Sequence, residues 1–191
     1  RLVEETPNSF YANQYHNQDN TEAHYKYTGP ELWRQTEGEI DAFVSGLGTG
    51  GTITGTGTFL KECKPSIELV GADVRGSVYY DFWKSGKIVP AFSYKVEGIG
   101  EDFFPSTIDL SIVDHVYQLS DKECFDTTRT LARLEGIYTG GSGGAAVLAA
   151  IRYAEEIDRP ANIVVLLPDS AARYLNKIFD DDWMREHGFL D

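Results

Sequence analysis

Short apolar runs alternate along this chain with amphipathic or glycine-led stretches. The apolar runs predict strands at residues 40–48, 67–74, 114–120 and 162–169. The last of these, NIVVLLPD, contains no polar residue between Asn162 and Pro168, which is typical of a strand buried on both faces. Strands of this kind occur in parallel sheets that are covered by helices, so we expect such a sheet here.

The stretches between the apolar runs carry helix signals. Helices are expected at residues 29–38, 52–64, 121–136 and 140–157, with Ser120 as an N-cap and Gly136 as a C-terminal stop. Residues 76–109 are rich in aromatic residues and are expected to form loops. Alternating strands and helices predict a three-layer α/β fold with a mostly parallel sheet, formed by residues 1–191 as one domain.

The composition and net charge of the chain argue against some classes of binding partner. The 191 residues are 41% hydrophobic, enough for a core, and 30 acidic against 17 basic residues give a net charge of -13. Nucleic acid and membrane surfaces are therefore not expected as partners. Cys63 and Cys124 are far apart and form no CxxC pair, and the four histidines have no metal-ligand spacing. We expect a cytoplasmic protein without a metal, whose histidines lie at the surface or cap helices.

A glycine-rich segment follows the first predicted strand and opens the next helix. Gly48, Thr49, Gly50, Gly51 and Thr52 form the sequence GTGGT. Glycines let a ligand approach the backbone closely, and free N–H groups at a helix start attract an anion. Phosphate binding is the functional interpretation, and a tight turn that binds nothing is the structural one.

The same segment also fits a dinucleotide-binding motif. Gly46, Gly48 and Gly51 satisfy GxGxxG, and Asp73 ends the next strand, where such folds place a ribose-binding acid. A P-loop is excluded, because no Gly-Lys-Ser/Thr follows. GxGxxG alone is a weak signal, so the dinucleotide interpretation stays open.

A second glycine-rich loop, YTGGSGGAAV at residues 138–147, starts another predicted helix. Its central Ser142 is a neutral hydroxyl among four glycines, and a dinucleotide domain does not need it. Two loops at helix starts suit a small phosphorylated aromatic ring that is held at both ends. The alternative is that Ser142 only caps its helix.

Together, GTGGT, VEGIG at residues 96–100, GGSGG at residues 140–144 and LPDSAARYLNKIF at residues 167–179 resemble the pyridoxal-phosphate β-family, or fold type II. Within it, the chain is similar to the cystathionine β-synthases and cysteine synthases from about Ala12 onward. The ending KIFDDDWMREHGFL favours the cystathionine β-synthases.

The resemblance implies pyridoxal 5'-phosphate as cofactor and a role for each matching residue. The GTGGT residues would hold the phosphate, and Ser142 would face the pyridine nitrogen. Gly98 and Gly100 would line the ring and the substrate channel, and Gln14 would help to bind the substrate carboxylate. A serine there makes the cofactor a milder electron sink than a carboxylate would.

Two departures from the family pattern affect the expected activity. None of the eight lysines matches the motif of the lysine that carries the cofactor, and Lys177 is expected in a surface-exposed C-terminal helix. We therefore expect a fragment of a longer enzyme that is inactive alone. Its expected partner is a second copy, in a homodimer, or the missing N-terminal segment. Glu101 replaces the tyrosine that animal-type members carry after GIG, which leaves the second substrate open.

The resemblance implies β-replacement on serine, or O-activated serine, with a thiol. Homocysteine, giving cystathionine, is the first hypothesis, and sulfide with O-acetylserine, as in a cysteine synthase, is the second. A dinucleotide-binding module and a non-catalytic fragment are the further alternatives.

Overall fold

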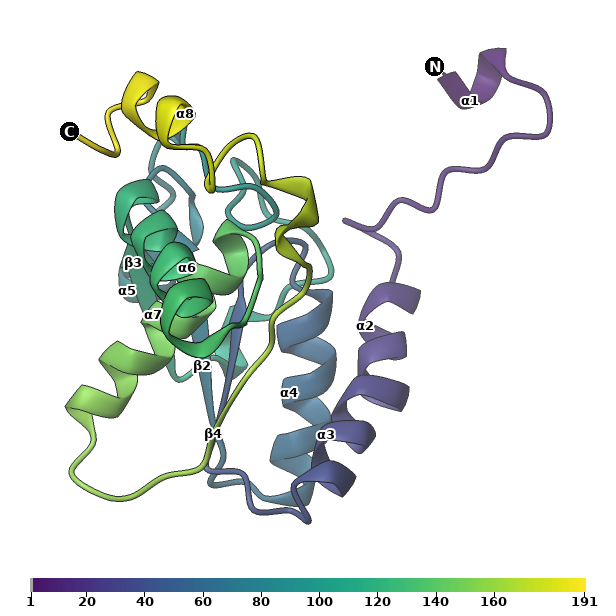
Figure 1. Cartoon of the computed structure of the whole chain (residues 1–191). Helices are drawn as coiled ribbons and strands as arrows, with labels where there is room; N and C mark the ends of the chain where they lie inside the picture. The colour runs from purple at the N-terminus through teal and green to yellow at the C-terminus, as the bar shows by residue number, and fades with distance from the viewer. Residues whose placement is uncertain (1) are drawn as a thin grey trace.

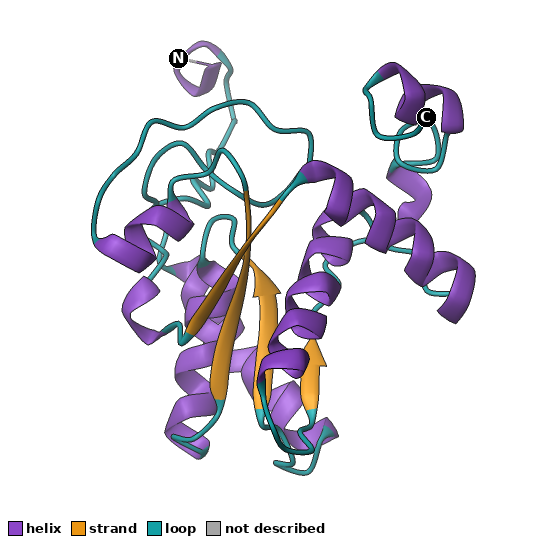
Figure 2. Ribbon diagram, turned by 90° about the vertical axis from the view of Figure 1, so that its left-hand side faces the viewer, coloured by secondary structure: helices purple, strands orange, loops and turns teal. Residues whose placement is uncertain are grey.

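The computed structural model describes residues 2–191, and its centre is a sheet of four parallel strands. The strands are β1 (Ala42–Gly46), β2 (Glu68–Val74), β3 (His115–Leu119) and β4 (Ile163–Val165). They lie in the order β3-β2-β1-β4, so β1 is flanked by β2 and β4 (Figure 2). Parallel strands need crossover connections, and here helices provide them.

Helices cover both faces of the sheet (Figure 1). One face carries α4 (Gly51–Cys63) and α5 (Tyr79–Ser85), with α2 (Asp19–Ala23) and α3 (Gly29–Gln35) packed on α4. The other carries α6 (Asp121–Glu135), α7 (Gly141–Glu156) and α8 (Asp181–Glu186). This confirms the predicted three-layer α/β fold with a parallel sheet.

Successive residues of a strand point to opposite faces, and β1 shows how this creates two cores. Phe43 packs into the apolar cluster with Ile53 and Leu60 of α4, whereas Val44 packs into the cluster with Ala145 of α7. Each of these five side chains is fully buried. The small residues of α7 let that helix lie close to the sheet.

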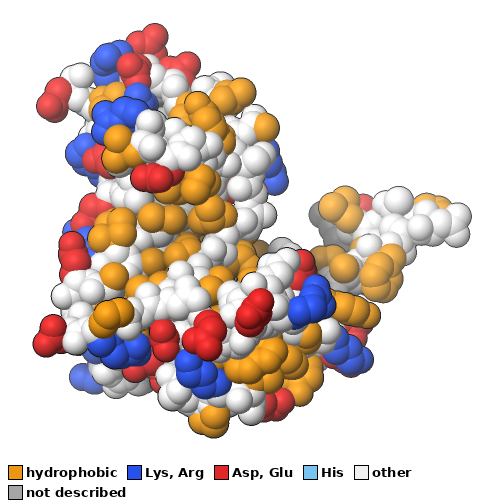
Figure 3. Space-filling model, turned by 60° about the horizontal axis from the view of Figure 1, so that its bottom comes forward, with side chains coloured by type: hydrophobic (Ala, Val, Ile, Leu, Met, Phe, Trp, Pro, Cys, Tyr) orange, Lys and Arg blue, Asp and Glu red, His pale blue; other side chains and the backbone are white. Residues whose placement is uncertain are grey.

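Four short segments complete the described chain. They are α1 (Leu2–Glu5), the π-helix η1 (His24–Thr28), and the 3-10 helices η2 (Leu110–Ile112) and η3 (Ala171–Arg173). The first lies on an arm that stands away from the body (Figure 3). No helix within residues 2–191 is long and apolar enough to cross a membrane.

Several element predictions are confirmed and others need correction. The four predicted strands and four predicted helices all form, although α4 begins one residue earlier than expected and α2 and α8 were not predicted. Ser120 caps α6 in a capping box with Glu123. Residues 76–109, however, contain α5, which ends at Gly86 in the left-handed conformation. Lys177 lies in a turn and not in a helix, and it is half-buried and paired with Glu97.

The strand predicted at residues 162–169 is shorter and less buried than expected. Only Ile163–Val165 pair with β1, and all three residues are half-buried. Within residues 2–191, β4 is an edge strand, so its outer side lacks the neighbour that would bury it. Pro168 follows closely, and proline disfavours continued strand pairing.

Gly50 is the point where the chain turns from β1 into α4. Its φ is 86°, in the left-handed region, and an added Cβ would lie 2.2 Å from Cβ of Ile108. Gly86 is also left-handed, with φ 69°, but an added Cβ there would meet nothing within 4 Å. A comparison of substitutions at the two glycines therefore distinguishes the cost of left-handed backbone strain from the cost of a steric clash.

We expect Gly50→Ala to lower the free energy of unfolding by about 2–5 kcal/mol, from left-handed strain plus overpacking against Ile108. Gly86→Ala should cost only about 1–2 kcal/mol, from the strain alone. Urea denaturation of both purified variants measures these losses. Equal losses would show that the contact with Ile108 does not constrain Gly50.

Asp73 anchors α5 to the sheet. Its side chain is fully buried, and Oδ2 accepts a hydrogen bond of 2.9 Å from the backbone N–H of Tyr80. Its Oδ1 has no hydrogen-bond partner within residues 2–191. Burial raises the pKa of Asp73 from 3.8 to about 6, because desolvation disfavours the carboxylate.

This raised pKa predicts a pH dependence of stability. The folded state holds the proton more tightly than the unfolded state, so the contribution is complete below about pH 4 and is lost as pH rises through 6. The shift corresponds to about 3 kcal/mol. Urea unfolding at pH 4 and pH 7.5 should show Asp73→Asn gaining stability relative to the parent by about that amount.

Asp158→Asn provides the control, because Asp158 is exposed in the loop after α7. Its effect should stay within roughly 0.5 kcal/mol at both pH values, as for most surface substitutions. A relative stability of Asp73→Asn that does not change with pH would contradict the burial argument.

Candidate functional site

The main candidate site lies at the carboxyl ends of β1 and β4. From β1, the chain continues to β2 and then to β3 on one side of β1. Strand β4 pairs with the other side of β1, so the strand order reverses between β1 and β4. Ligands of open α/β sheets bind outside the carboxyl ends of the strands at such a point. A pocket of about 310 Å³ is present here.

The glycine loop forms one wall of the pocket and is held by three other segments. Thr107 Oγ1 donates to the carbonyl oxygen of Thr49 (2.5 Å), and Tyr79 OH donates to that of Gly48 (2.7 Å). Asn20 Nδ2 donates to Thr49 Oγ1 (3.0 Å). Because carbonyl groups of the loop are bonded on its outer side, its backbone is fixed where it meets the pocket.

The groups at the glycine-loop end of the pocket are neutral dipoles and not charged side chains. The N-terminus of α4 opens there, and its orphan N–H groups carry partial positive charge. Thr49 and Thr52 add hydroxyl groups, and the residues that line the pocket include no lysine or arginine. This arrangement suits an anion that is bound by helix dipole and hydrogen bonds.

Thr52 is oriented by a histidine from the neighbouring helix. His24 Nε2 lies 3.1 Å from Thr52 Oγ1, and its Nδ1 lies 2.9 Å from Thr28 Oγ1. Burial lowers the pKa of His24, which favours the neutral imidazole. The expectation that each histidine is a surface or capping residue is wrong here, since His24 is half-buried beside the pocket.

Ser142 faces the same pocket from the opposite side. Its side chain is 4% exposed, and its hydroxyl has no hydrogen-bond partner within residues 2–191. The N-cap of α7 is Gly140, whose N–H donates to Asp169 Oδ1 (2.9 Å), and no side chain caps this helix. Ser142 therefore does not cap α7, so the capping interpretation is wrong.

The pocket brings together seven of the nine residues predicted from the sequence. They are Gln14, Gly48, Thr49, Gly50, Thr52, Gly98 and Ser142. Gly51 begins α4 and lies against Asn20, while Gly100 donates its N–H to Leu47 and packs near Val74 and Tyr94. These two glycines shape the backbone around the pocket and do not line it.

Other lining residues were not predicted. They are Ser45, Ile99, Leu166 and Pro168, with Gly46 known only from the dinucleotide motif. The supporting residues Asn20, Tyr79 and Thr107 were also missed. Ile99 and Pro168 lie in VEGIG and LPDSAARYLNKIF, two of the motifs that carry the resemblance, whereas Tyr79 and Thr107 lie in none of these motifs.

Asp73 does not support the dinucleotide interpretation. It is buried under α5, where it accepts the N–H of Tyr80, and it does not line the pocket. A ribose-binding acid would have to reach the ligand.

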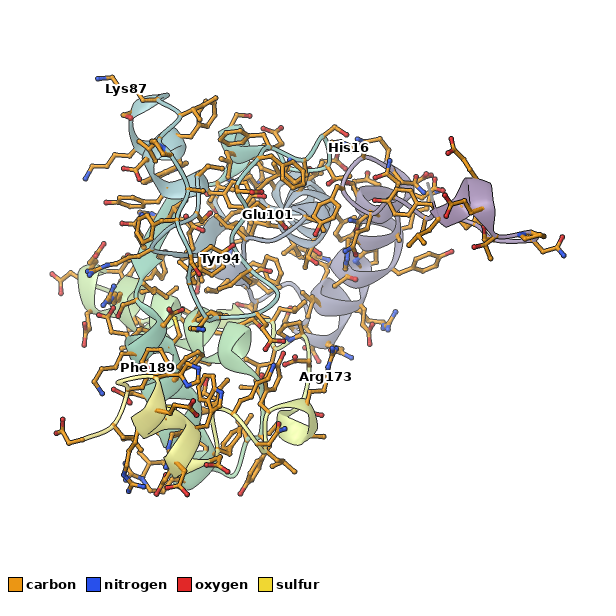
Figure 4. The ribbon with its side chains drawn as sticks, turned by 90° about the horizontal axis from the view of Figure 1, so that it is seen from above. His16, Lys87, Tyr94, Glu101, Arg173 and Phe189 are labelled. Carbon is orange, nitrogen blue, oxygen red and sulfur yellow. The ribbon has the colours of Figure 1, made fainter. Side chains whose placement is uncertain are left out.

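Glu101 lies beside the pocket and not in its lining, with Tyr94 nearby (Figure 4). Burial raises the pKa of Glu101, and the nearby Tyr15 hydroxyl partly offsets this effect. Its backbone N–H donates to Ser77 Oγ (3.2 Å). The Glu101–Tyr15 pair thus places a polar group next to Gln14 and the substrate side of the pocket.

The donors present fit a small phosphorylated ring. The helix dipole and two threonine hydroxyls would suit a phosphate, glycine backbone would leave room beside a flat ring, and the Ser142 hydroxyl would be available to a ring heteroatom. Pyridoxal phosphate has these features. Within residues 2–191, no cluster of three histidine, cysteine or acidic side chains could hold a metal ion.

Comparison with known proteins agrees with this fit. Residues 1–169 match the family model described as pyridoxal-phosphate dependent enzyme. The cystathionine β-synthase of Apis mellifera is 42% identical over 190 residues, and that of Oryctolagus cuniculus is 41% identical over 191. These alignments cover 100% of this chain but 37% and 34% of the relatives.

A cysteine synthase is similar as well. The enzyme of Buchnera aphidicola is 38% identical over 180 residues, covering 92% of this chain and 56% of the relative. The chain thus spans about a third of the length of the cystathionine β-synthases it matches. Its matched residues, its parallel α/β fold and its pocket make it a member of the family of pyridoxal-phosphate-dependent enzymes.

Proposed function

We propose that the protein containing this sequence joins serine, or an O-activated serine, to homocysteine in a β-replacement that yields cystathionine. The observation that carries the proposal is the pocket between two helix N-termini, with phosphate donors at one end and Ser142 at the other. The similarity to cystathionine β-synthases over the whole chain supports it.

In this proposal Gly48, Thr49, Gly50 and Thr52 hold the phosphate of pyridoxal phosphate, and Gly51 supports them as the first residue of α4. When bound, the cofactor supplies an electron sink for charge that develops at the substrate Cα. His24 keeps the Thr52 hydroxyl directed toward the phosphate, since the two side chains lie 3.1 Å apart. Because His24 is half-buried and its pKa is lowered, it acts there as a neutral hydrogen-bonding group.

The remaining residues orient the ring and the substrate. Ser142 faces the ring nitrogen as a neutral partner, and Gly98 leaves room beside the ring because it has no side chain. Gly100 supports that loop from behind through its bond to Leu47. Gln14 helps to bind the substrate carboxylate at the exposed side of the pocket.

Under this proposal, the lysine that carries the cofactor does not lie in the present sequence. None of the lysines in residues 2–191 lines the pocket. The chain aligns with about a third of its longer relatives, so another segment supplies the lysine and closes the pocket. Residues 1–191 then form part of one catalytic domain of a cytoplasmic homodimer and are inactive alone.

Sulfide with O-acetylserine is the second candidate chemistry. It is favoured by the similarity to the Buchnera cysteine synthase over 92% of the chain. The pocket residues to which this proposal gives a role contact the cofactor and the amino-acid substrate, so they do not discriminate between thiols.

Assays of the full-length, cofactor-loaded protein with each pair of substrates distinguish the two reactions. Serine and O-acetylserine are each offered with homocysteine or sulfide, and the products are quantified by mass spectrometry. We expect kcat/KM for homocysteine to exceed that for sulfide. A preference for sulfide would replace the proposal with the cysteine synthase alternative, and no product from any pair would reject both.

Ser142→Asp tests the orientation of the cofactor. A carboxylate facing the ring nitrogen would favour its protonated form, because an opposite charge stabilises the charged state. We expect the cofactor to stay bound, its absorbance to shift, and β-replacement to fall by on the order of tenfold or more. Ser142→Ala is the size-matched neutral control and should shift the absorbance less. An unchanged spectrum and activity in Ser142→Asp would contradict the proposed orientation.

A further inference from the structure

A second hollow, of about 460 Å³, lies along the outer edge of the sheet, away from the pocket described above. Strand β3 forms its floor through residues 115–118. Tyr80, Trp83 and Lys84 of α5 form one wall, and Arg152 and Glu156 of α7 form the other. Arg75, which follows β2, lies at one end. We call this hollow the edge cleft.

The floor of the edge cleft offers backbone hydrogen-bonding groups. Among the strands within residues 2–191, β3 pairs with β2 alone, so its other side is an open edge. An open edge presents unpaired N–H and C=O groups to whatever lies against it. In this cleft, they face a space of the size that small ligands occupy.

Two cations of the edge cleft lack a carboxylate partner. Arg75 and Lys84 appear in none of the ion pairs formed within residues 2–191. The other charged lining groups are engaged, since Arg152 pairs with Glu123 and Glu156 accepts the hydroxyl of Tyr117. In a chain with a net charge of -13, two unpaired cations on one cleft mark a place for an anion.

The α5 wall adds flat aromatic surface next to these cations. The rings of Tyr80 and Trp83 lie 6.4 Å apart at 35°, and Trp83 Nε1 donates to the carbonyl oxygen of Val113 (2.9 Å). Lys84 Nζ lies 5.3 Å from the centre of the Tyr80 ring and donates to its hydroxyl (3.2 Å). Both rings are half-buried, so they hold fixed orientations while they line the cleft.

We propose that the edge cleft binds a nucleoside phosphate. The phosphate lies at Arg75 and Lys84, since a guanidinium group forms paired, charge-assisted hydrogen bonds with phosphate oxygens. The base packs against Tyr80 and Trp83. The polar edge of the base bonds to the open peptide groups of β3, which present both donors and acceptors.

The test uses AMP as the probe and the full-length protein loaded with pyridoxal phosphate, so that the cofactor site is filled. Calorimetry gives the Kd, and tryptophan fluorescence reports on Trp83. We expect saturable binding that quenches the fluorescence, with the quenching lost in Trp83→Phe because Trp33 and Trp183 do not line the cleft. Inorganic phosphate alone should bind at least tenfold more weakly than AMP.

Arg75→Ala and Lys84→Ala should each weaken AMP binding about tenfold, because each removes one charge-assisted contact. Both side chains are exposed, so folding should be preserved. Lys87→Ala is the matched control, since Lys87 follows α5, points outward and does not line the cleft (Figure 4). It should leave the Kd unchanged.

Any of four outcomes would overturn the proposal. The first three are the absence of saturable AMP binding, equal affinity for AMP and phosphate, and equal losses in the Lys84 and Lys87 variants. The fourth is binding that leaves the Trp83 signal unchanged, because the base would then lie elsewhere. None of these outcomes bears on β-replacement activity, so the two proposals fail independently.

Discussion

The close approach of neighbouring segments to the backbone of residues 48–51 is the constraint on which the rest of the site depends. A Cβ at Gly48 would lie 2.8 Å from the carbonyl oxygen of Gly98, and one at Gly51 would lie 2.1 Å from Asn20. The segments that press on the loop also bond to it, through Asn20, Tyr79 and Thr107. The loop is therefore fixed before any ligand arrives, and such preorganisation lowers the cost of binding.

Helix α5 is only seven residues long but contacts several parts of the structure. Its first residue, Tyr79, bonds to the glycine loop, and Tyr80 is held by the buried Asp73. The side chains of Tyr80, Trp83 and Lys84 then face the edge cleft. The same short helix thus supports the glycine loop of the main pocket and lines the edge cleft, and the buried carboxyl group of Asp73 is one of its anchors to the sheet.

The neutrality of the main pocket contrasts with the acidity of the whole chain. No lysine or arginine lines the pocket, and the nearby His24 favours its neutral form. Charge on a ligand is met there by oriented peptide groups and hydroxyls, which act at short range and in fixed directions. Such a site selects a ligand by geometry more than by long-range attraction.

The sequence predicted the framework well because its signals are local. Apolar runs predicted the strands, and Ser120 as an N-cap predicted the start of α6, where the structure adds a capping box with Glu123. Helix α5 was missed because its seven residues are mostly aromatic, show little helical periodicity and depend on Asp73 for their anchor. Tyr79 and Thr107 were missed for a related reason. They reach the loop across 31 and 58 residues of sequence, and no local pattern encodes such a contact.

The role of Ser142 shows a different limit. Sequence alone allowed either a cap or a ligand contact, because serine is favoured in both positions. Whether Ser142 caps the helix depends on where the helix begins, and the sequence predicts that boundary poorly when four glycines surround the residue. The structure places the boundary at Gly140, two residues earlier.

The π-helix between α2 and α3 affects how this region can change over evolutionary time. A π turn amounts to one extra residue within an α-helix, and His24–Thr28 is such a segment. Because the wide turn accommodates that extra residue, deleting one residue between His24 and Gly29 would restore a regular helix and leave the two flanks in nearly the same orientation. His24 would still face Thr52, and Gly29 would still pack against Phe59. Related sequences can therefore differ in length by one residue at this turn, as they can in the exposed loop after α5.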